Sequence, residues 1–239
     1  MRAVVMAGGR GARMRPYTTV LPKPLLPVGE RPIIAILLEQ LAAAGATRID
    51  ICLGYLGELI QAYLDQTPPD IGDTEIHFNT EPEPLGTAGA LREIDSLDEP
   101  FLLLNGDVLT SLDFGGLMDA HLQSGAELTV TVRTNRTEIG SGVLTLDGDR
   151  ITAYDEKPVQ EHVVSMGIYA ISPAALEYLP DGRVDVPELV ENLIGAGRPV
   201  AAHQLDGSWY DIGTPDDHRD ATEEIDRSPG RYLGATREE

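Results

Sequence analysis

The sequence predicts an α/β fold in which one mixed, mostly parallel sheet is flanked by helices on both faces. The first observation is a set of short apolar runs that predict strands, at residues 2–7, 48–53, 75–79, 100–105 and 127–133. The second is a set of helical patterns between those runs, near residues 32–44, 56–65, 87–95 and 114–123. Because strand and helix alternate, consecutive strands are expected to lie parallel. The 239 residues, 42% of them hydrophobic, are enough for one sizeable core.

The second half of the chain has a different pattern. It predicts strands joined by tight turns such as Asp147-Gly148-Asp149, at residues 139–147, 150–156 and 162–171. Three further helices are predicted at residues 173–179, 186–195 and 215–226. No linker separates the halves, so we predict a single domain over residues 1–239. Residues 136–226 are expected to fold over residues 1–135 as a lobe, and residues 227–239 to form a frayed tail.

The chain is strongly acidic overall but basic at its start. A net charge of −21 argues against nucleic acid or an anionic membrane as a partner. The first 29 residues nevertheless contain no acid and five cations, Arg2, Arg10, Arg13, Arg15 and Lys23. We expect this segment to receive an anion; the alternative is that its cations pair with the acidic remainder of the chain.

Lysine and cysteine are both rare in this chain, and their positions indicate which of them belong to a ligand site. The chain has 16 arginines but only two lysines, Lys23 and Lys157, each before a proline, which suggests sites that need a compact ammonium. The single cysteine, Cys52, lies in an apolar run and is predicted to be a buried packing residue.

No apolar stretch approaches the roughly 20 residues of a membrane span. Glycines interrupt the apolar start before a signal-peptide core could form, so a cytoplasmic protein is expected.

A glycine-rich turn, Gly8-Gly9-Arg10-Gly11-Ala12-Arg13, directly follows the first predicted strand. Glycines at the C-terminal end of a strand let backbone N–H groups approach a phosphate, and the arginines add charge. The turn is not a dinucleotide fingerprint, because the third glycine would fall at Met14, and no Gly-Lys-Ser/Thr makes it a Walker loop. Four prolines in residues 15–29 predict that the next segment is extended rather than helical, with Lys23 beside the turn.

Two later segments also carry residues suited to a ligand site. In residues 81–91, Gly86 would let a planar base approach closely, and Thr87 would cap the helix that follows. In residues 101–107, Asp107 ends a buried strand, where open α/β sheets bind ligands. Taken alone, the first segment equally fits an ordinary loop with a helix cap, and Asp107 an ordinary turn residue.

Residues 7–32 closely resemble the N-terminal motif of the sugar-1-phosphate nucleotidyltransferases, nearest to mannose- and heptose-1-phosphate guanylyltransferases. The family usually reads Gly-Gly-x-Gly-Thr-Arg-Leu-x-Pro-x-Thr and then Pro-Lys-Pro, whereas this chain has Ala12 for the threonine and Met14 for the leucine. Later segments match in the same order, so the resemblance covers essentially residues 1–225. It implies a Rossmann-like fold of the nucleotide-diphospho-sugar transferase type. Residues 1–135 would then bind the nucleotide, and residues 136–226 would form the sugar-binding lobe.

The resemblance also implies the site residues. The nucleotide would be bound by Ala7, Gly8, Gly9, Gly11, Ala12, Arg13, Glu81, Leu85, Gly86, Thr87, Asn105 and Gly106. The implied catalytic residues are Arg13 at the triphosphate, Lys23 at the transferred phosphate, and Asp107. Residues 209–215 match the family's late Trp-x-Asp-x-Gly-Thr-Pro, so Asp107 and Asp211 would hold the cofactor Mg²⁺.

The sugar 1-phosphate would be bound by residues of the second half. By resemblance, Gly142 lies under the sugar ring, Glu156 holds sugar hydroxyls, and Lys157 holds the sugar phosphate. Ser165 and Gly167 belong to a family segment that commonly begins with Asn, so Ser165 is a departure that removes the usual amide contact. As an alternative, Glu156 and Lys157 would form only a surface ion pair.

The implied reaction is attack by a sugar 1-phosphate on the α-phosphorus of a nucleoside triphosphate, with positioning and electrostatics as the source of catalysis. GTP is the expected triphosphate, because the carboxylate of Glu81 can accept two hydrogen bonds from guanine.

Thymidylyl or uridylyl transfer to a hexose 1-phosphate such as glucose 1-phosphate is the alternative within the family. A non-catalytic nucleotide-sugar sensor would lack the carboxylates and lysines, and an oxidoreductase would need the missing third glycine. A monomer or a homodimer is expected.

Overall fold

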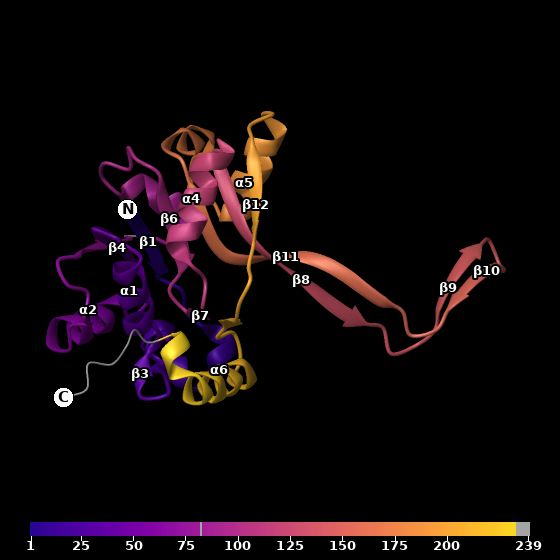
Figure 1. The fold of residues 1–239 in the computed structure, drawn as a ribbon, viewed down its shortest axis with the longest axis horizontal. Coiled ribbons are helices and arrows are strands. Elements are labelled where there is room, and N and C mark those ends of the chain that lie inside the picture. The colour runs from indigo at the N-terminus through magenta and orange to yellow at the C-terminus, as the bar shows by residue number, and fades with distance from the viewer. Residues whose placement is uncertain (82, 233–239) are drawn as a thin grey trace.

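The computed structural model describes residues 1–81 and 83–232, and its centre is one seven-stranded mixed sheet (Figure 1). The strands lie in the order β12-β8-β11-β6-β1-β4-β5. Their bounds are β1 Arg2–Ala7, β4 Arg48–Leu53, β5 Glu75–Thr80, β6 Phe101–Asn105, β8 Leu128–Glu138, β11 Val159–Ile171 and β12 Val200–Gln204. The neighbours β6, β1, β4 and β5 are parallel, as are β8 and β12, whereas β11 is antiparallel to both β6 and β8. The predicted mixed, mostly parallel sheet is confirmed.

Helices cover both faces of the sheet because the strand residues alternate between the faces. In β1, Ala3 and Val5 pack in a buried cluster with α1, α2 and α4, while Val4 packs in a separate cluster with α5. Cys52 belongs to the second cluster and is 1% exposed, which confirms its predicted packing role. The helices are α1 Ile33–Ala43, α2 Gly57–Gln66, α3 Gly86–Gly89, α4 Phe114–Ser124, α5 Val186–Gly195 and α6 Pro215–Arg227. Within the described residues, no helix is both long enough and apolar enough to span a membrane.

A small antiparallel pair brings the end of the chain to the main sheet. Strand β7 (Val108–Thr110) pairs with β13 (Trp209–Asp211), so that Asp211 lies opposite Val108. Helix α6 then packs on a third buried cluster that includes Met14, Leu26 and Ile225. A two-residue pair, β2 (Pro27–Val28) with β3 (Arg31–Pro32), leads into α1. These contacts hold β13 and α6 against β7 and against the early segment that contains Met14 and Leu26.

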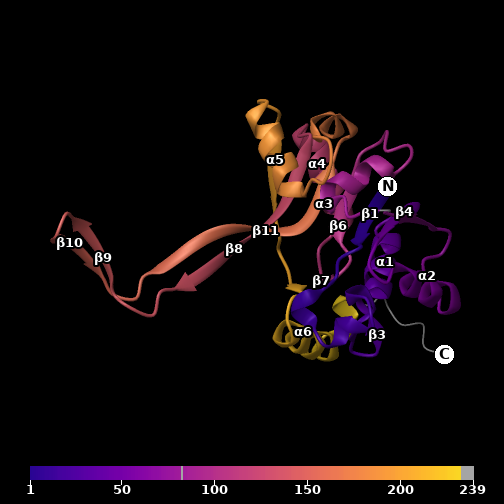
Figure 2. The same ribbon diagram turned by 180° about the vertical axis from the view of Figure 1, so that it is seen from behind.

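Strands β8 and β11 continue beyond the sheet as a two-stranded ribbon, which ends in a hairpin of β9 (Val143–Asp147) and β10 (Arg150–Asp155). We refer to residues 134–163 as the arm. Figures 1 and 2 show the arm projecting away from the body on the side of β8 and β11. The expectation that residues 136–226 fold over residues 1–135 was therefore wrong for the arm. It was also wrong for β11 and β12, which extend the sheet itself.

Other segments differ from the predictions for local physical reasons. The proline-rich segment is not fully extended: it contains 3₁₀ turns at Tyr17–Thr19 and Lys23–Leu25, because the fixed φ of proline also suits the start of a helical turn. Another 3₁₀ turn, Ala12–Met14, precedes it. The predicted helices 87–95 and 173–179 are shorter, as α3 with the 3₁₀ turn Ala90–Glu93, and as the 3₁₀ helix Pro173–Tyr178.

The predicted frayed tail is ordered as far as the structure describes it. A 3₁₀ turn spans Pro229–Arg231, and Tyr232 is buried. The Tyr232 hydroxyl donates to Glu224 at 3.1 Å, and its carbonyl accepts from the Gln40 amide at 3.2 Å. Residues 233–239 lie outside the described residues.

Candidate active site

A cavity of about 750 Å³ lies at the C-terminal ends of β1, β4 and β6, the edge at which open α/β sheets bind ligands. The predicted residues that line it are Ala7, Gly8, Gly9, Gly11, Ala12, Arg13, Lys23, Glu81, Gly86, Thr87, Asn105 and Asp107. Leu85, Gly106 and Asp211 are not among the lining residues but adjoin them. Gly106 donates its N–H to the Met6 carbonyl at 2.8 Å, which gives it a backbone role.

The glycine-rich turn is held rigidly by close backbone packing. Gly8 lies against Gly54. A Cβ added to Gly54 would come within 2.7 Å of the Gly8 carbonyl oxygen, so the two backbones could not approach this closely if residue 54 had a side chain. That oxygen accepts a hydrogen bond from the Tyr55 N–H at 3.2 Å. Gly11 has a φ of +56°, which favours glycine, and its carbonyl accepts from the Thr18 hydroxyl at 2.8 Å. The cavity is thus walled at this point by backbone rather than by bulky side chains.

Two carboxylates share one ammonium at the floor of the cavity. Nζ of Lys23 lies 2.5 Å from Oδ2 of Asp107 and 3.4 Å from Oδ1 of Asp211. Pairing of β7 with β13 holds the two acids together, and the Ile212 N–H donates to the Asp107 carbonyl at 3.2 Å. Burial raises the pKa of Asp107; the Lys23 ammonium opposes this effect, and the charge of Asp211 adds to it.

The chemistry of this pair fits a magnesium ion. Oδ1 of Asp107 is buried and has no hydrogen-bond partner among the described residues, so one hard oxygen ligand is available. The described residues contain no cluster of three or more His, Cys, Asp or Glu side chains that would hold a metal without help. Two carboxylates can still suffice for Mg²⁺, because phosphate oxygens and water complete its octahedral shell.

Glu81 and the segment after it form the opposite wall of the cavity. One Glu81 oxygen, Oε2, accepts the Leu85 N–H at 2.9 Å, which orients the carboxylate. Gly86 has a φ of +82°, and an added Cβ would collide with the Val184 carbonyl, so its glycine is required by close packing against the start of α5.

The expectation that Thr87 caps its own helix was wrong. The Thr87 backbone N–H and hydroxyl instead donate to Oδ1 of Asp185, at 2.9 and 3.3 Å, and the hydroxyl oxygen accepts the Val186 N–H at 3.0 Å. Asp185 is the N-cap residue of α5. Thr87 therefore ties α3 to the start of α5, a long-range contact that its position in the sequence does not indicate.

A second cavity, of about 570 Å³, adjoins Asp211 and is lined by the side chains of Arg133 and Trp209. The Arg133 guanidinium lies over the Trp209 ring, 5.5 Å from its centroid, and the indole N–H donates to the Met166 carbonyl at 2.9 Å. Gly167, with a φ of +68°, packs against the Asn105 amide, where an added Cβ would come within 2.7 Å. Gly167 thus adjoins the first cavity through Asn105.

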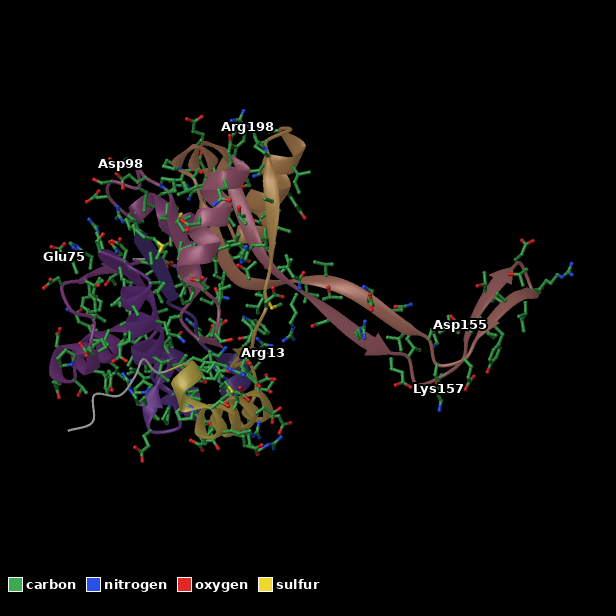
Figure 3. All side chains as sticks on the ribbon, viewed as in Figure 1. Arg13, Glu75, Asp98, Asp155, Lys157 and Arg198 are labelled. Atoms are coloured by element: carbon green, nitrogen blue, oxygen red, sulfur yellow. The ribbon has the colours of Figure 1, made fainter. Side chains whose placement is uncertain are left out.

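The remaining predicted sugar residues lie away from both cavities. The Ser165 hydroxyl is 3.2 Å from the Tyr169 hydroxyl at the base of the arm. Gly142, Glu156 and Lys157 are farther out, where the ribbon meets the β9–β10 hairpin, and Figure 3 shows Lys157 far from Arg13. Within one chain, the structure does not bring these three residues to the glycine-rich turn.

The basic start of the chain is divided between two ends of the molecule. Arg10 and Arg13 line the first cavity, as expected for an anion site. Arg2, at the opposite end of β1, pairs instead with the buried carboxylate of Asp50 at 2.8 Å. The prediction that the basic start receives an anion was therefore wrong for Arg2. Arg2 follows the alternative instead, since it pairs with an acid of the same chain.

The lining residues that the sequence interpretation missed include Gly54, Tyr55, Arg183 and Asp185. Gly54 and Tyr55 could have been found from the sequence, because they directly follow the predicted strand at residues 48–53. The C-terminal ends of such strands form the ligand-binding edge of the sheet. Arg183 and Asp185 have no local signal, since the packing of α5 on α3 brings them to the cavity.

The chain is similar to known proteins over nearly its whole length. The family model for nucleotidyl transferases matches residues 2–228. A mannose-1-phosphate guanyltransferase from Candida albicans is 32% identical over 231 residues, covering 93% of this chain and 64% of the relative. A UTP–glucose-1-phosphate uridylyltransferase from Synechocystis is 31% identical over 238 residues, covering 91% of this chain and 61% of the relative. The chain thus spans less than two thirds of the length of both relatives.

Solved structures agree with these matches. HddC from Yersinia pseudotuberculosis has a TM-score of 0.72 and 26% identity, covering 94% of this chain and 99% of that one. A UDP-glucose pyrophosphorylase has the same fold, with a TM-score of 0.71 and 18% identity, covering 95% of this chain and 98% of that one. The family model for nucleotidyl transferases covers residues 2–228, and the glycine-rich turn lies at the ligand-binding edge of a mixed sheet. The chain belongs to the nucleotidyl transferase family.

Proposed function

We propose that this chain transfers a nucleoside monophosphate from a triphosphate, preferably GTP, to a sugar 1-phosphate and releases pyrophosphate. One observation carries the proposal. A single cavity has the glycine-rich turn and Glu81 along its walls and the Lys23–Asp107 pair at its floor. The turn suits a triphosphate, Glu81 suits a base, and the acidic pair suits the cation that such a reaction requires.

The proposed reaction needs no general base. An oxygen of the sugar phosphate, already anionic, forms a bond to the α-phosphorus of the triphosphate. The bond from that phosphorus to the oxygen bridging to the β-phosphate breaks, and pyrophosphate leaves with the electron pair. The protein therefore has to bring two polyanions together and stabilise the charge that develops on the leaving group.

We assign Arg10 and Arg13 to the triphosphate, since both line the cavity beside the glycine-rich turn. Lys23 is assigned to the transferred phosphate, because its ammonium lies between the two carboxylates on the cavity floor. Asp107 and Asp211 would hold Mg²⁺, with the unpartnered Oδ1 of Asp107 as one ligand. When bound there, the ion would neutralise charge on the phosphate oxygens.

The preference for guanine rests on Glu81. Its Oε2 is oriented by the Leu85 N–H, and a carboxylate retains enough lone pairs to accept both N1–H and the exocyclic amine of guanine. The names of relatives support this choice, since mannose-1-phosphate guanyltransferases from Candida albicans and Aspergillus fumigatus are 32% and 33% identical to this chain.

The sugar 1-phosphate is proposed to lie between Asp211 and the second cavity. Trp209 offers an aromatic face there, and Arg133 offers a cation beside it. Gly167 adjoins the first cavity through Asn105, and Ser165 is proposed as a sugar residue although it lies at the base of the arm, away from both cavities. Gly142, Glu156 and Lys157 remain proposed sugar-phosphate residues, although in a single chain they lie at the far part of the arm.

Uridylyl transfer to glucose 1-phosphate is the second candidate. It is favoured by the 31% identity to the Synechocystis uridylyltransferase. The two candidates share the fold, the metal pair and the phosphate chemistry, and they differ in the base edge that faces Glu81.

A pyrophosphate-release screen tests the proposal. Five triphosphates (GTP, UTP, dTTP, ATP and CTP) would be combined with mannose, heptose and glucose 1-phosphates in the presence of Mg²⁺. We expect the fastest release with GTP and a mannose-type 1-phosphate. Faster release with UTP would support the second candidate. Binding of nucleotides or nucleotide sugars without pyrophosphate release in any combination would contradict an enzymatic function and support a sensor.

A further inference from the structure

The hairpin at the end of the arm has one apolar face that none of the described residues covers. Register in β9 and β10 places Leu144 opposite Tyr154 and Leu146 opposite Ile151. Side chains of directly opposite residues lie on the same face of a sheet, so these four form one apolar surface. They are between 44% and 65% exposed. An isolated two-stranded hairpin is marginally stable at best, which indicates that the face is covered when the protein functions.

A polar cluster is preformed where the ribbon meets this hairpin. The Tyr154 hydroxyl donates to the Glu156 carboxylate at 2.8 Å, and Gly142 leaves the space that this hydroxyl occupies. Next to Glu156, Lys157 has a φ of +47°, a backbone conformation that is unfavourable for a residue with a Cβ; such strained residues are enriched at functional sites. Neither of the two cavities described above is lined by a residue of this cluster, so it suits a site supplied by another surface.

The arm cannot bring this cluster to the cavity of its own chain without bending. The ribbon is a continuous ladder from Val159–Glu138 to Ser165–Val132. The six steps along β11 from Ser165 to Val159, two residues before which Lys157 lies, span about 20 Å at the usual rise per residue. The ladder therefore holds Lys157 away from the body, as Figure 3 shows, and within reach of a second molecule.

The rim of the first cavity offers a surface that is complementary to the arm. Tyr17, Val20 and Leu21 are exposed there, and Tyr55, which lines the cavity, donates its hydroxyl to the Thr19 carbonyl at 3.4 Å. Three exposed cations of the basic segment, Arg10, Arg13 and Arg15, lie in or next to the lining of this cavity, whereas Arg2 and Lys23 pair with acids of their own chain. The arm has six acids and three cations in residues 134–163. On a body that is acidic elsewhere, this rim is the part that attracts an acidic arm with an apolar face.

We propose that two copies of this chain exchange arms, so that Glu156 and Lys157 of each copy complete the sugar-phosphate site of the other. Each chain carries both an arm and a rim, so two copies can make the contact twice, and we place them as a closed two-fold dimer. The inference rests on the proposed function for the roles of Glu156 and Lys157. The assembly itself follows from the uncovered face and the charges.

Sedimentation equilibrium of the full-length chain tests the assembly without any assay of activity. The expected mass at micromolar concentration is twice the 25.8 kDa of one chain. Leu146→Lys should weaken the dimer at least tenfold, because it places a charge on the apolar face. The matched control is Thr145→Lys, which changes an exposed neighbour on the opposite face of the same strand. A monomeric wild type, or equal dimerisation of the two variants, would overturn the inference.

Mixed dimers test the exchange of the site residues. One subunit would carry Asp107→Asn and the other Lys157→Ala, with two different tags to purify the mixed species. Exchange predicts one complete site, formed by the intact body of the second subunit and the intact arm of the first, and hence about half of the wild-type turnover. Arms that act within their own chain predict turnover no higher than that of the two parent variants, and this result would overturn the inference.

The two experiments separate this inference from the proposed function. If the unmodified chain releases no pyrophosphate with any substrate pair, the proposed function and the exchanged site both fail, while the sedimentation result still decides whether the arms join two copies. If the unmodified chain is active but monomeric, the proposed function stands and the exchange of arms is wrong.

Discussion

The two carboxylate oxygens of Asp107 have different surroundings. One of its oxygens is bonded to Lys23, and the other is buried without a partner among the described residues. A buried, unpartnered acceptor is unfavourable by about 1–3 kcal/mol unless a ligand satisfies it. Asp107 is therefore the residue on which the proposed Mg²⁺ site chiefly rests.

We predict that Asp107→Asn and Asp211→Asn each lower turnover by about 10²–10³-fold, because each removes a charge from the proposed metal site. Both changes keep the size of the side chain, so the thermal unfolding midpoint should stay within a few degrees of wild type. Turnover at saturating Mg²⁺ and thermal unfolding are the measurements. Asp119→Asn, at an exposed position of α4, is the control and should change neither. Wild-type turnover in both site variants would contradict the metal assignment.

Glu81 permits a sharper prediction about the base. In Glu81→Gln, the amide oxygen must face the Leu85 N–H that now bonds Oε2, which turns the amide NH₂ toward the base. That NH₂ opposes the N–H donors of guanine and matches a carbonyl of uracil. We therefore expect the ratio of kcat/KM for GTP to that for UTP to fall about tenfold or more.

The control for this change is Glu83→Gln, which alters an exposed neighbour that does not line the cavity. It should leave the GTP-to-UTP ratio unchanged. If Glu81→Gln also leaves the ratio unchanged, Glu81 does not read the base, and the backbone must do so.

At the scale of elements, the pairing of β1 with β4 includes a fully buried carboxylate. Asp50 in β4 is bonded to Arg2 of β1 at 2.8 Å and to Arg48 at 2.7 Å, and its side chain is 0% exposed. Burial acts to raise the pKa of Asp50, but the hydrogen bonds and charges of the two arginines outweigh it, so the pKa is lowered. The cluster thus joins the first strand to its neighbour at the end opposite the cavity.

We expect Asp50→Asn to lower the free energy of unfolding by about 3–5 kcal/mol at pH 7, because it leaves two arginines without their buried partner. Since the folded pKa is lowered, the ionised group stabilises the fold above its unfolded pKa of about 4, and this stabilisation is lost as the pH falls through the folded pKa. The difference between wild type and variant should therefore hold from pH 7 down to about pH 4 and shrink as the pH falls further. Urea unfolding measures it, with the exposed Asp65→Asn as the control. A difference that does not depend on pH would show that the charge is not the cause.

At the scale of the whole molecule, the body and the arm differ in what they contribute. The three buried clusters lie in the body, whereas the strands β9 and β10 have no buried residue. Folding of the body should therefore not depend on the arm, although the proposed sugar-phosphate residues lie on it.

Replacing residues 135–162 with Asn-Gly should test this division. Thr134 and Val163 are opposite each other in the ladder, so a two-residue turn can join them. The thermal unfolding midpoint and the affinity for GTP should stay close to wild type, while turnover with a sugar 1-phosphate should fall by at least about 10²-fold. Calorimetry, nucleotide titration and pyrophosphate release are the measurements. Loss of GTP affinity together with turnover would show that the arm also forms the nucleotide site.

The regular parts of the fold were predictable because they depend on local pattern. Strand β1 and strand β4 occur at the predicted residues, and α5 begins and ends where its periodicity indicated. Strands β7 and β13 were not predicted, because three residues are too few for a period to be read. Their pairing is what brings Asp211 to Asp107, so the geometry of the acidic pair could not be derived from pattern alone.

The sequence by itself determined the class of fold, the glycine-rich turn, and the residue types of the proposed site, because apolar period, glycine and proline act over a few neighbouring residues. Only the tertiary structure decided which of those residues meet. It placed Lys23 between Asp107 and Asp211, assigned Arg2 to Asp50 at the far end of β1, and directed Thr87 to the start of α5. It also carried Lys157 out along the arm. Such contacts depend on how strands of distant sequence pair and pack, and no local pattern of residues encodes that pairing.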